Sequence, residues 1–214
     1  MNLRLARHAG PLLLGALLLA ACLPAVRPPA PVSLYTLQPA RQERLAPDFA
    51  AFTEMILIMP VRLAPQLQER GLLVRRTDGE LRTSPGHLWA GPLDEQIGAS
   101  LAAGLRGLLG TEQVAAFPGP RFAATRYQVE VEVTEFSGDA GSFTLQAVYT
   151  VSDAAARRML ARHACHRTLP IDAPDHAGSV AAASRAVDGL SREVAATLLA
   201  AERPPRPGVP SHAP

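Results

Sequence analysis

Two segments in the second half of the chain alternate apolar and polar side chains, which is the pattern of strands with one buried face. Residues 126–136 read RYQVEVEVTEF, and residues 142–151 read SFTLQAVYTV. Between them, residues 138–141 (GDAG) have the composition of a tight turn, so the two segments are predicted to form a hairpin. Residues 159–169 follow as a weaker third strand.

The first half of the chain contains shorter strand patterns. Residues 33–37 (SLYTL) predict a short strand, and the continuous apolar run at 54–63 (EMILIMPVRL) predicts a central strand buried on both faces. Residues 72–76 and 80–83 flank Asp78 and Gly79, a pair typical of hairpin turns. These strands are predicted to join the later three in one sheet.

Two segments have the spacing of amphipathic helices. The first, 92–109, is defined by Leu93, Ile97, Leu101, Leu105 and Leu108, and Gly110 is placed to cap its C-terminus. The second is defined by Val180, Ala183, Val187, Leu190, Val194 and Leu198. Together with the strands they predict one α+β domain at 33–202, with a mixed or antiparallel sheet and both helices packed on one face.

The N-terminus has the features of an export signal. Arg4 and Arg7 precede an apolar run at 11–21, which is too short to span a bilayer and ends in Leu-Ala-Ala before Cys22. This sequence resembles a lipobox, which implies removal of 1–21 and acylation of Cys22. An ordinary signal peptide with an incidental cysteine is the alternative. Leu23 follows where aspartate would favour the inner membrane, so the outer membrane is the predicted location.

The segments that flank the domain are rich in proline. Residues 22–32 are predicted to be a lipidated, extended tether, and 203–214 (RPPRPGVPSHAP) a disordered tail. Loss of 1–21 removes Arg4 and Arg7 and lowers the formal charge from +2 to zero. A neutral mature chain gives no reason to expect nucleic-acid binding. All 21 basic residues are arginine, which excludes a catalytic lysine.

One short cluster, His163-Ala164-Cys165-His166, resembles a metal site in composition. On a strand His163 and Cys165 share a face while His166 points away, so three converging ligands are not expected. Cys165 is instead predicted to be a buried structural thiol. No G-x-S-x-G elbow and no phosphate loop occur, so a hydrolase triad is not expected, and no cofactor or metal is expected.

Two segments carry a family resemblance. Residues 87–97 read HLWAGPLDEQI and residues 131–138 read VEVTEFSG. Both resemble segments of the PqiC (YmbA) lipoproteins, the ABC-type transport auxiliary lipoproteins, and the resemblance continues in order over roughly 33–200. The chain departs from the family at Gln66, where tyrosine is frequent, and at Tyr149, where tryptophan is frequent.

The resemblance implies a function. Lipoproteins of this family work beside MCE-domain proteins, which form a hydrophobic tunnel across the periplasm and connect to a membrane permease complex. The system moves phospholipid or other apolar molecules between the membranes. The lipoprotein would be a non-enzymatic docking component, often homo-oligomeric. A structural or assembly lipoprotein without a transport role, or an envelope enzyme, stays open beside it.

The candidate partner interface is the stretch containing Leu88, Trp89, Pro92 and Asp94. Trp89 is the only tryptophan, and Pro92 is expected at the first helical position, which would fix the direction of the preceding loop. Trp89 is predicted to anchor a partner, although core packing is the alternative. Asp94 could simply complement the helix dipole. The glutamates at positions 130, 132 and 135 suggest either a solvated sheet face or a contact with a partner's arginines.

Overall fold

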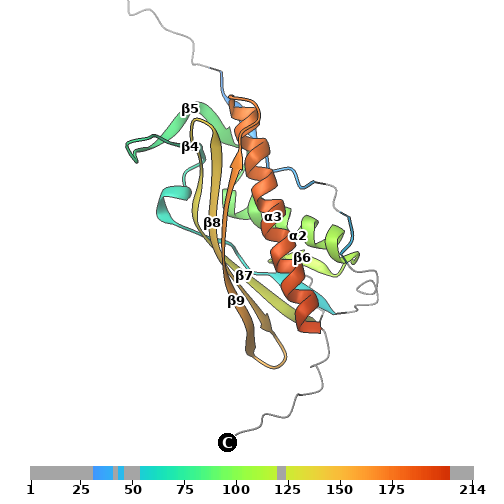
Figure 1. The fold of residues 1–214 in the computed structure, drawn as a ribbon. Helices are drawn as coiled ribbons and strands as arrows, with labels where there is room; N and C mark the ends of the chain where they lie inside the picture. The colour runs from blue at the N-terminus through green and yellow to red at the C-terminus, as the bar shows by residue number, and fades with distance from the viewer. Residues whose placement is uncertain (1–30, 41–42, 46–53, 120–123, 203–214) are drawn as a thin grey trace, which may run out of the picture. The chain divides into compact units, whose positions relative to one another are not determined.

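The computed structural model describes residues 31–40, 43–45, 54–119 and 124–202 (Figure 1). The predicted signal peptide, Cys22, most of the tether and the tail 203–214 lie outside the described residues. Among the described residues, no helix is long and apolar enough to cross a membrane.

Nine strands of the described chain form one mixed sheet. They are β1 (Ser33–Tyr35), β2 (Met55–Ile58), β3 (Arg62–Leu63), β4 (Gly71–Arg75), β5 (Leu81–Trp89), β6 (Val114–Ala116), β7 (Thr125–Gly138), β8 (Ser142–Asp153) and β9 (Arg158–Pro170). The order is β1-β5-β4-β7-β2-β6, with β3 and β8 also paired to β7 and β9 paired to β8. Neighbours in sequence (β4–β5, β7–β8, β8–β9) pair antiparallel, whereas β1–β5, β2–β6 and β2–β7 pair parallel.

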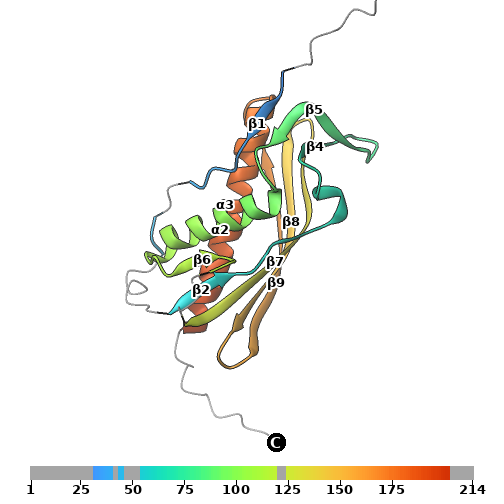
Figure 2. The ribbon, with the colours of Figure 1, turned by 180° about the vertical axis from the view of Figure 1, so that it is seen from behind.

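Two helices complete the α+β domain, as predicted. Helix α3 (His176–Glu202) lies along β8 and β9, and α2 (Leu93–Leu109) contacts both α3 and β6 (Figures 1 and 2). A single turn of 3-10 helix, η2 (Pro65–Leu67), connects β3 to β4. The apolar stripes of both helices meet the inward side chains of the sheet in one hydrophobic core.

The β7–β8 hairpin confirms the alternation seen in the sequence. Tyr127, Val129, Val131 and Val133 are at most 1% exposed, and the inward residues of β8 join them in the core. Cys165 of β9 lies opposite Ala147 of β8 and is 2% exposed, so its predicted burial is also confirmed.

Some predicted boundaries were wrong for local physical reasons. The run at 54–63 is two strands rather than one, because the ladder breaks around Pro60, which lacks an N–H to donate. The first strand ends at Tyr35, and β5 continues well beyond residue 83. Pro92 is the N-cap of α2, with φ −54° and ψ 133°, rather than its first helical residue. Strand β6 was not predicted.

Candidate partner interface

The predicted interface residues lie where β5 ends and α2 begins. Trp89, the last residue of β5, is 3% exposed, and its ring lies 5.9 Å from that of Phe136 in β7. Phe136 in turn meets Phe143 edge to face at 4.8 Å. This burial is what core packing of Trp89 requires, so its indole has little surface left for a partner.

The neighbours of Trp89 are more accessible. Pro92 is exposed, and Leu88 and Asp94 are half-buried. Asp94 and Glu95 lie in the first turn of α2, where carboxylates complement the helix dipole. Pro92 has no side-chain cap to offer, so these acidic residues are the favourable charges at this helix end. A partner that contacts this stretch would therefore meet Pro92 and Asp94, with Trp89 supporting them from beneath.

Arg70 holds the backbone of this junction. The Trp89 N–H donates to the Arg70 carbonyl at 2.7 Å, while the Arg70 guanidinium donates to the Trp89 carbonyl at 3.0 and 3.2 Å and to that of Ala90 at 3.1 Å. The Ala90 N–H donates to the Tyr35 carbonyl in β1 at 2.7 Å. These bonds satisfy six backbone groups at the junction.

Gln96 ties the same junction to the N-terminal segment. Its amide nitrogen donates to the Gly91 carbonyl at 3.1 Å, and its oxygen accepts from the Leu37 N–H at 3.0 Å. Sequence reasoning did not single out Arg70 or Gln96. Gln96 lies inside the 87–97 motif and so could have been found there, but nothing near Arg70 in the sequence points to Trp89.

A groove of about 460 Å³ opens beside this junction. We call this groove the docking groove. It is lined by the predicted residues Pro92 and Asp94, with Leu93, and by residues after β2 and η2: Val61, Arg62, Leu63 and Gln68. The volume lies within the range of sites that hold a side chain or small ligand. Its lining combines an apolar floor with one cation and one anion.

The glutamates of the outer sheet face have arginine partners within the chain. Arg62 lies 3.7 Å from Glu130 and 3.3 Å from Glu132, and Arg75 lies 3.0 Å from Glu135. The pairs of Arg62 are about half exposed and contribute little stability, so a partner's charges can replace them at small cost.

The His163-Cys165-His166 cluster has the arrangement expected from strand geometry. Cys165 is buried, whereas His163 and His166 are exposed; His163 lies against the Tyr149 ring at 5.6 Å, and His166 is 3.4 Å from Thr168 Oγ1. Burial raises the pKa of the Cys165 thiol to about 11, with Glu193 adding to the shift. A thiol held protonated in this way is a poor nucleophile and a poor metal ligand. Across the described residues no three potential ligands converge on one point.

The comparisons with known proteins agree with this fold. The model of the ABC-type transport auxiliary lipoprotein component matches residues 35–195. The structure resembles a protein of Xanthomonas campestris, XCC0632 of the family DUF330, at TM-score 0.65 and 19% identity, covering 78% of this chain and 95% of that one. An uncharacterised protein matches equally well, at TM-score 0.65 and 19% identity over 78% and 99% of the two chains. A comparison with curated proteins gave no match.

The matched residues span most of the described domain, so the chain belongs to the family of ABC-type transport auxiliary lipoprotein components. This family, also called YmbA/PqiC, is the one that the two motifs predicted. At 19% identity the two solved structures show likeness of fold alone. The family is one of accessory components rather than of known enzymes.

Proposed function

We propose that this protein is the outer-membrane lipoprotein of an MCE/Pqi-type system that carries phospholipid between the two membranes. In this role it docks the MCE-domain tunnel protein and its permease complex and catalyses no reaction. It is anchored by acyl chains on Cys22 and assembles as a homo-oligomer. The match to the transport auxiliary lipoprotein family over residues 35–195 is the observation that carries the proposal.

The geometry supports docking rather than catalysis. The docking groove lies beside a junction in which hydrogen bonds of Arg70, Ala90 and Gln96 connect β5 and α2 to the segment after η2 and to the N-terminal segment. A surface held this firmly loses little conformational freedom when a partner binds, which favours affinity. The ion pairs of Arg62 with Glu130 and Glu132 are exposed, so these side chains can pair with charges of the partner instead.

The proposal is tested by isolating the lipidated protein from detergent-extracted membranes and measuring how much MCE protein accompanies it. Asp94→Arg reverses a charge in the docking groove and should lower the recovered MCE protein about tenfold. Glu112→Arg is the matched control, because Glu112 is 93% exposed and lies outside the groove lining.

Each outcome of this experiment has a distinct meaning. If the wild-type protein recovers no MCE protein, the transport role fails and a structural role in the envelope replaces it. If Asp94→Arg and Glu112→Arg both recover as much MCE protein as the wild type, docking occurs at another surface. Separation of inner and outer membranes on the same samples tests the proposed location.

A further inference from the structure

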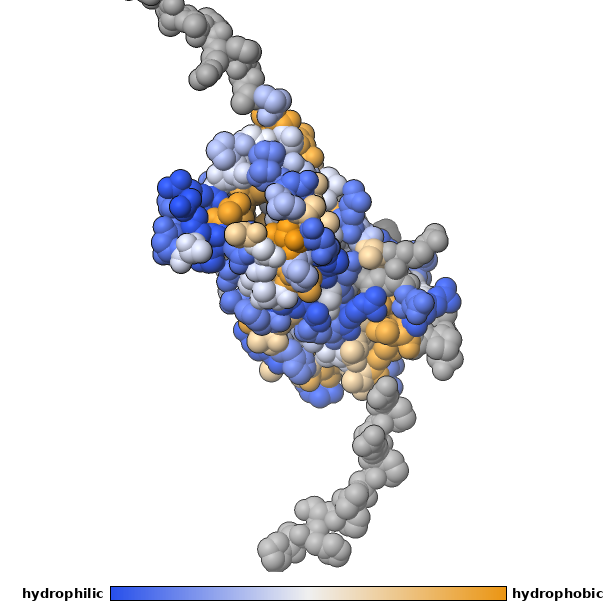
Figure 3. All heavy atoms as spheres, turned by 45° about the horizontal axis from the view of Figure 1, so that its top comes forward, coloured by the Kyte–Doolittle hydropathy of each residue, from blue (hydrophilic) through white to orange (hydrophobic). Residues whose placement is uncertain are grey.

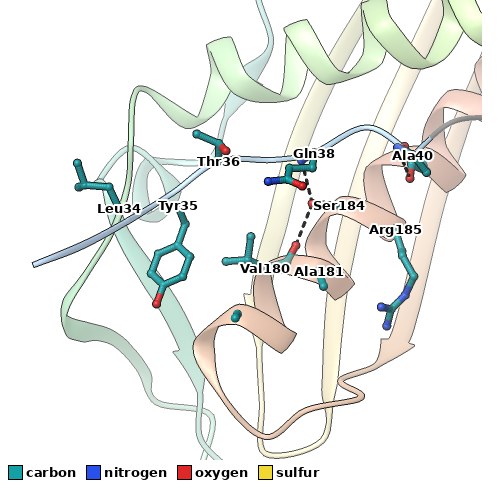
Figure 4. Close-up of a pocket in the computed structure, with 11 residues that line it drawn as sticks. Leu34, Tyr35, Thr36, Gln38, Ala40, Val180, Ala181, Ser184 and Arg185 are labelled. Atoms are coloured by element: carbon teal, nitrogen blue, oxygen red, sulfur yellow. Dashed lines mark hydrogen bonds between the residues drawn. The ribbon is translucent and has the colours of Figure 1, made fainter.

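A second groove runs between the N-terminal segment and α3, and we call it the tether groove. Its volume is about 450 Å³, and its lining includes Leu34 and Tyr35 on one side and Val180, Ala181, Ser184 and Arg185 on the other. Figure 4 shows Tyr35 and Gln38 on the extended segment beside the first turns of α3, with Leu34 at the outer edge of the groove. The lining is more apolar than polar, as in many sites for small molecules.

The walls of the tether groove are fixed by hydrogen bonds. The Gln38 N–H donates to Ser184 Oγ at 3.1 Å, and Ser184 donates to the Val180 carbonyl at 3.0 Å (Figure 4). Further along, the Ala40 N–H donates to both carboxylate oxygens of Asp188 at 3.2 Å. Because these bonds attach the extended segment to α3 at two separate points, the space between Leu34 and Ala181 is a lasting feature of the fold.

Large apolar side chains are exposed at the mouth of this groove. Val32 and Leu34 are each 59% exposed, and they lie two residues apart at the point where the described chain begins. Figure 3 shows hydrophobic surface at this end of the domain. Leu34 belongs to the groove lining, and Val32 adds exposed apolar surface two residues before it.

Chain length indicates which apolar partner is near. Val32 is the tenth residue after Cys22, and ten extended residues reach at most about 35 Å. An anchor on Cys22 would therefore keep Val32 within about 35 Å of the lipid surface, at the end of the domain where the tether groove lies. The partner available in greatest amount at that position is the membrane lipid itself.

We propose that the tether groove binds one phospholipid molecule, with an acyl chain between Leu34 and Ala181. The proposal rests on the transport function above and gives that function a lipid contact on this chain. Arg185 supplies a cation for the phosphate. The Arg185 guanidinium pairs with Asp172 at 3.0 Å and donates to the Pro170 carbonyl at 2.6 Å. The ion pair is solvent-exposed and therefore inexpensive to exchange, and the guanidinium keeps further donors for a phosphate. With Asp188 also in the lining, the groove carries no net charge, which fits a zwitterionic headgroup.

The test uses full-length lipidated protein in vesicles of phosphatidylethanolamine that contain a phosphatidylethanolamine analogue with a photoreactive acyl chain. Illumination and peptide mass spectrometry should place the label in residues 34–40 or 177–188. Ala181→Trp fills the groove from an exposed position and should lower this labelling at least fivefold. Ala196→Trp, at another exposed alanine of α3, is the matched control and should label as the wild type does.

Thermal unfolding of both variants shows that any lost labelling is not due to unfolding. Equal labelling of Ala181→Trp and wild type, or label confined to residues outside the two ranges, would overturn the proposal. Recovery of MCE protein from detergent-extracted cell membranes, measured on the same variants as for the docking groove, separates the two hypotheses. Retained recovery without groove labelling refutes lipid binding alone, whereas lost recovery in the wild type refutes the transport role.

Discussion

Trp89 shows how one residue can support an interface without forming its surface. It is 3% exposed, packs on Phe136, and its backbone bonds to Arg70 and lies beside Tyr35 in β1. Sequence reasoning placed Trp89 correctly in the segment before a helix. It could not decide between core and interface, because that depends on β7, which lies more than forty residues away in the chain.

Truncation of this side chain should therefore affect folding first. We expect Trp89→Ala to lower the free energy of unfolding by about 3–5 kcal/mol, the usual loss for a buried large aromatic residue. Chemical denaturation of the soluble domain 33–202 measures it. Phe117→Ala, at a ring that is 55% exposed, is the control and should cost much less. A small loss of stability in Trp89→Ala, together with weaker self-association or MCE binding, would instead favour the anchor role.

A pair of stacked histidines makes stability depend on pH. The rings of His87 in β5 and His176 in α3 are 3.5 Å apart and nearly parallel, and they are bonded to Tyr35 and Ser84. Desolvation lowers the pKa of His176 from its ordinary value of 6.5, the His87 ring lowers it further, and Asp175 opposes the shift. The stack joins residues 89 positions apart, so no local sequence pattern indicated it.

The sign of the effect follows from that shift. Because the folded protein holds the His176 proton less tightly than the unfolded chain, the unfolded state binds more protons near and below pH 6.5, and stability falls as the pH falls. We expect His176→Gln to reduce the loss of melting temperature between pH 7.5 and pH 5.5. His163→Gln, at an exposed position of β9, should leave the loss of melting temperature unchanged. Identical pH profiles for His176→Gln and wild type would contradict this account.

At the scale of elements, the ends of α2 follow local sequence rules. Gly110 caps the helix in the left-handed conformation, with φ 65°, and its N–H bonds to the Arg106 carbonyl. A Cβ at this position would also come within 2.7 Å of the Arg44 side chain. Gly107, one turn earlier, is an exposed helical residue with open space around its Cα.

The two glycines should respond to alanine in opposite directions. Gly110→Ala should destabilise the domain by about 1–2 kcal/mol, the cost of a left-handed conformation for a residue with a Cβ. Gly107→Ala should stabilise it by about 0.5–1 kcal/mol, because alanine loses less backbone entropy in a helix. Denaturant unfolding of both variants measures the difference. A change of the same sign at both positions would show that the cap does not control this helix end.

The length of an element decides how well the sequence predicts it. Strands β7 and β8 and helices α2 and α3 have enough residues for their periodicity to be unambiguous. The three-residue β6 offers no period, and its pairing with β2 is set by the return of the chain after α2. The sequence did not predict the docking groove. Two of its lining residues, Pro92 and Asp94, belong to a motif, whereas Arg62 and Gln68 reach the groove only through the fold.

Across the whole molecule, Gln96 connects the two proposed binding sites. Its side chain bonds both to Gly91, beside the docking groove, and to Leu37, in the segment that forms the tether groove. The extended segment 36–40 is therefore held from α2 on one side and from α3 on the other. A lipid bound in the tether groove and a partner docked at Pro92 and Asp94 would share this support.

The anchor itself can be tested with the second cysteine as control. We expect Cys22→Ala to release the mature domain from membranes, because the acyl chains would be absent and no described helix can span a bilayer. Cys165→Ala should remain membrane-bound and retain partner binding, since this buried thiol has no neighbouring cysteine and a raised pKa. Fractionation followed by a salt wash distinguishes the variants. If the Cys22→Ala domain stays with the washed membranes, attachment does not depend on acylation, and the position assigned to the tether groove near the lipid surface loses its basis.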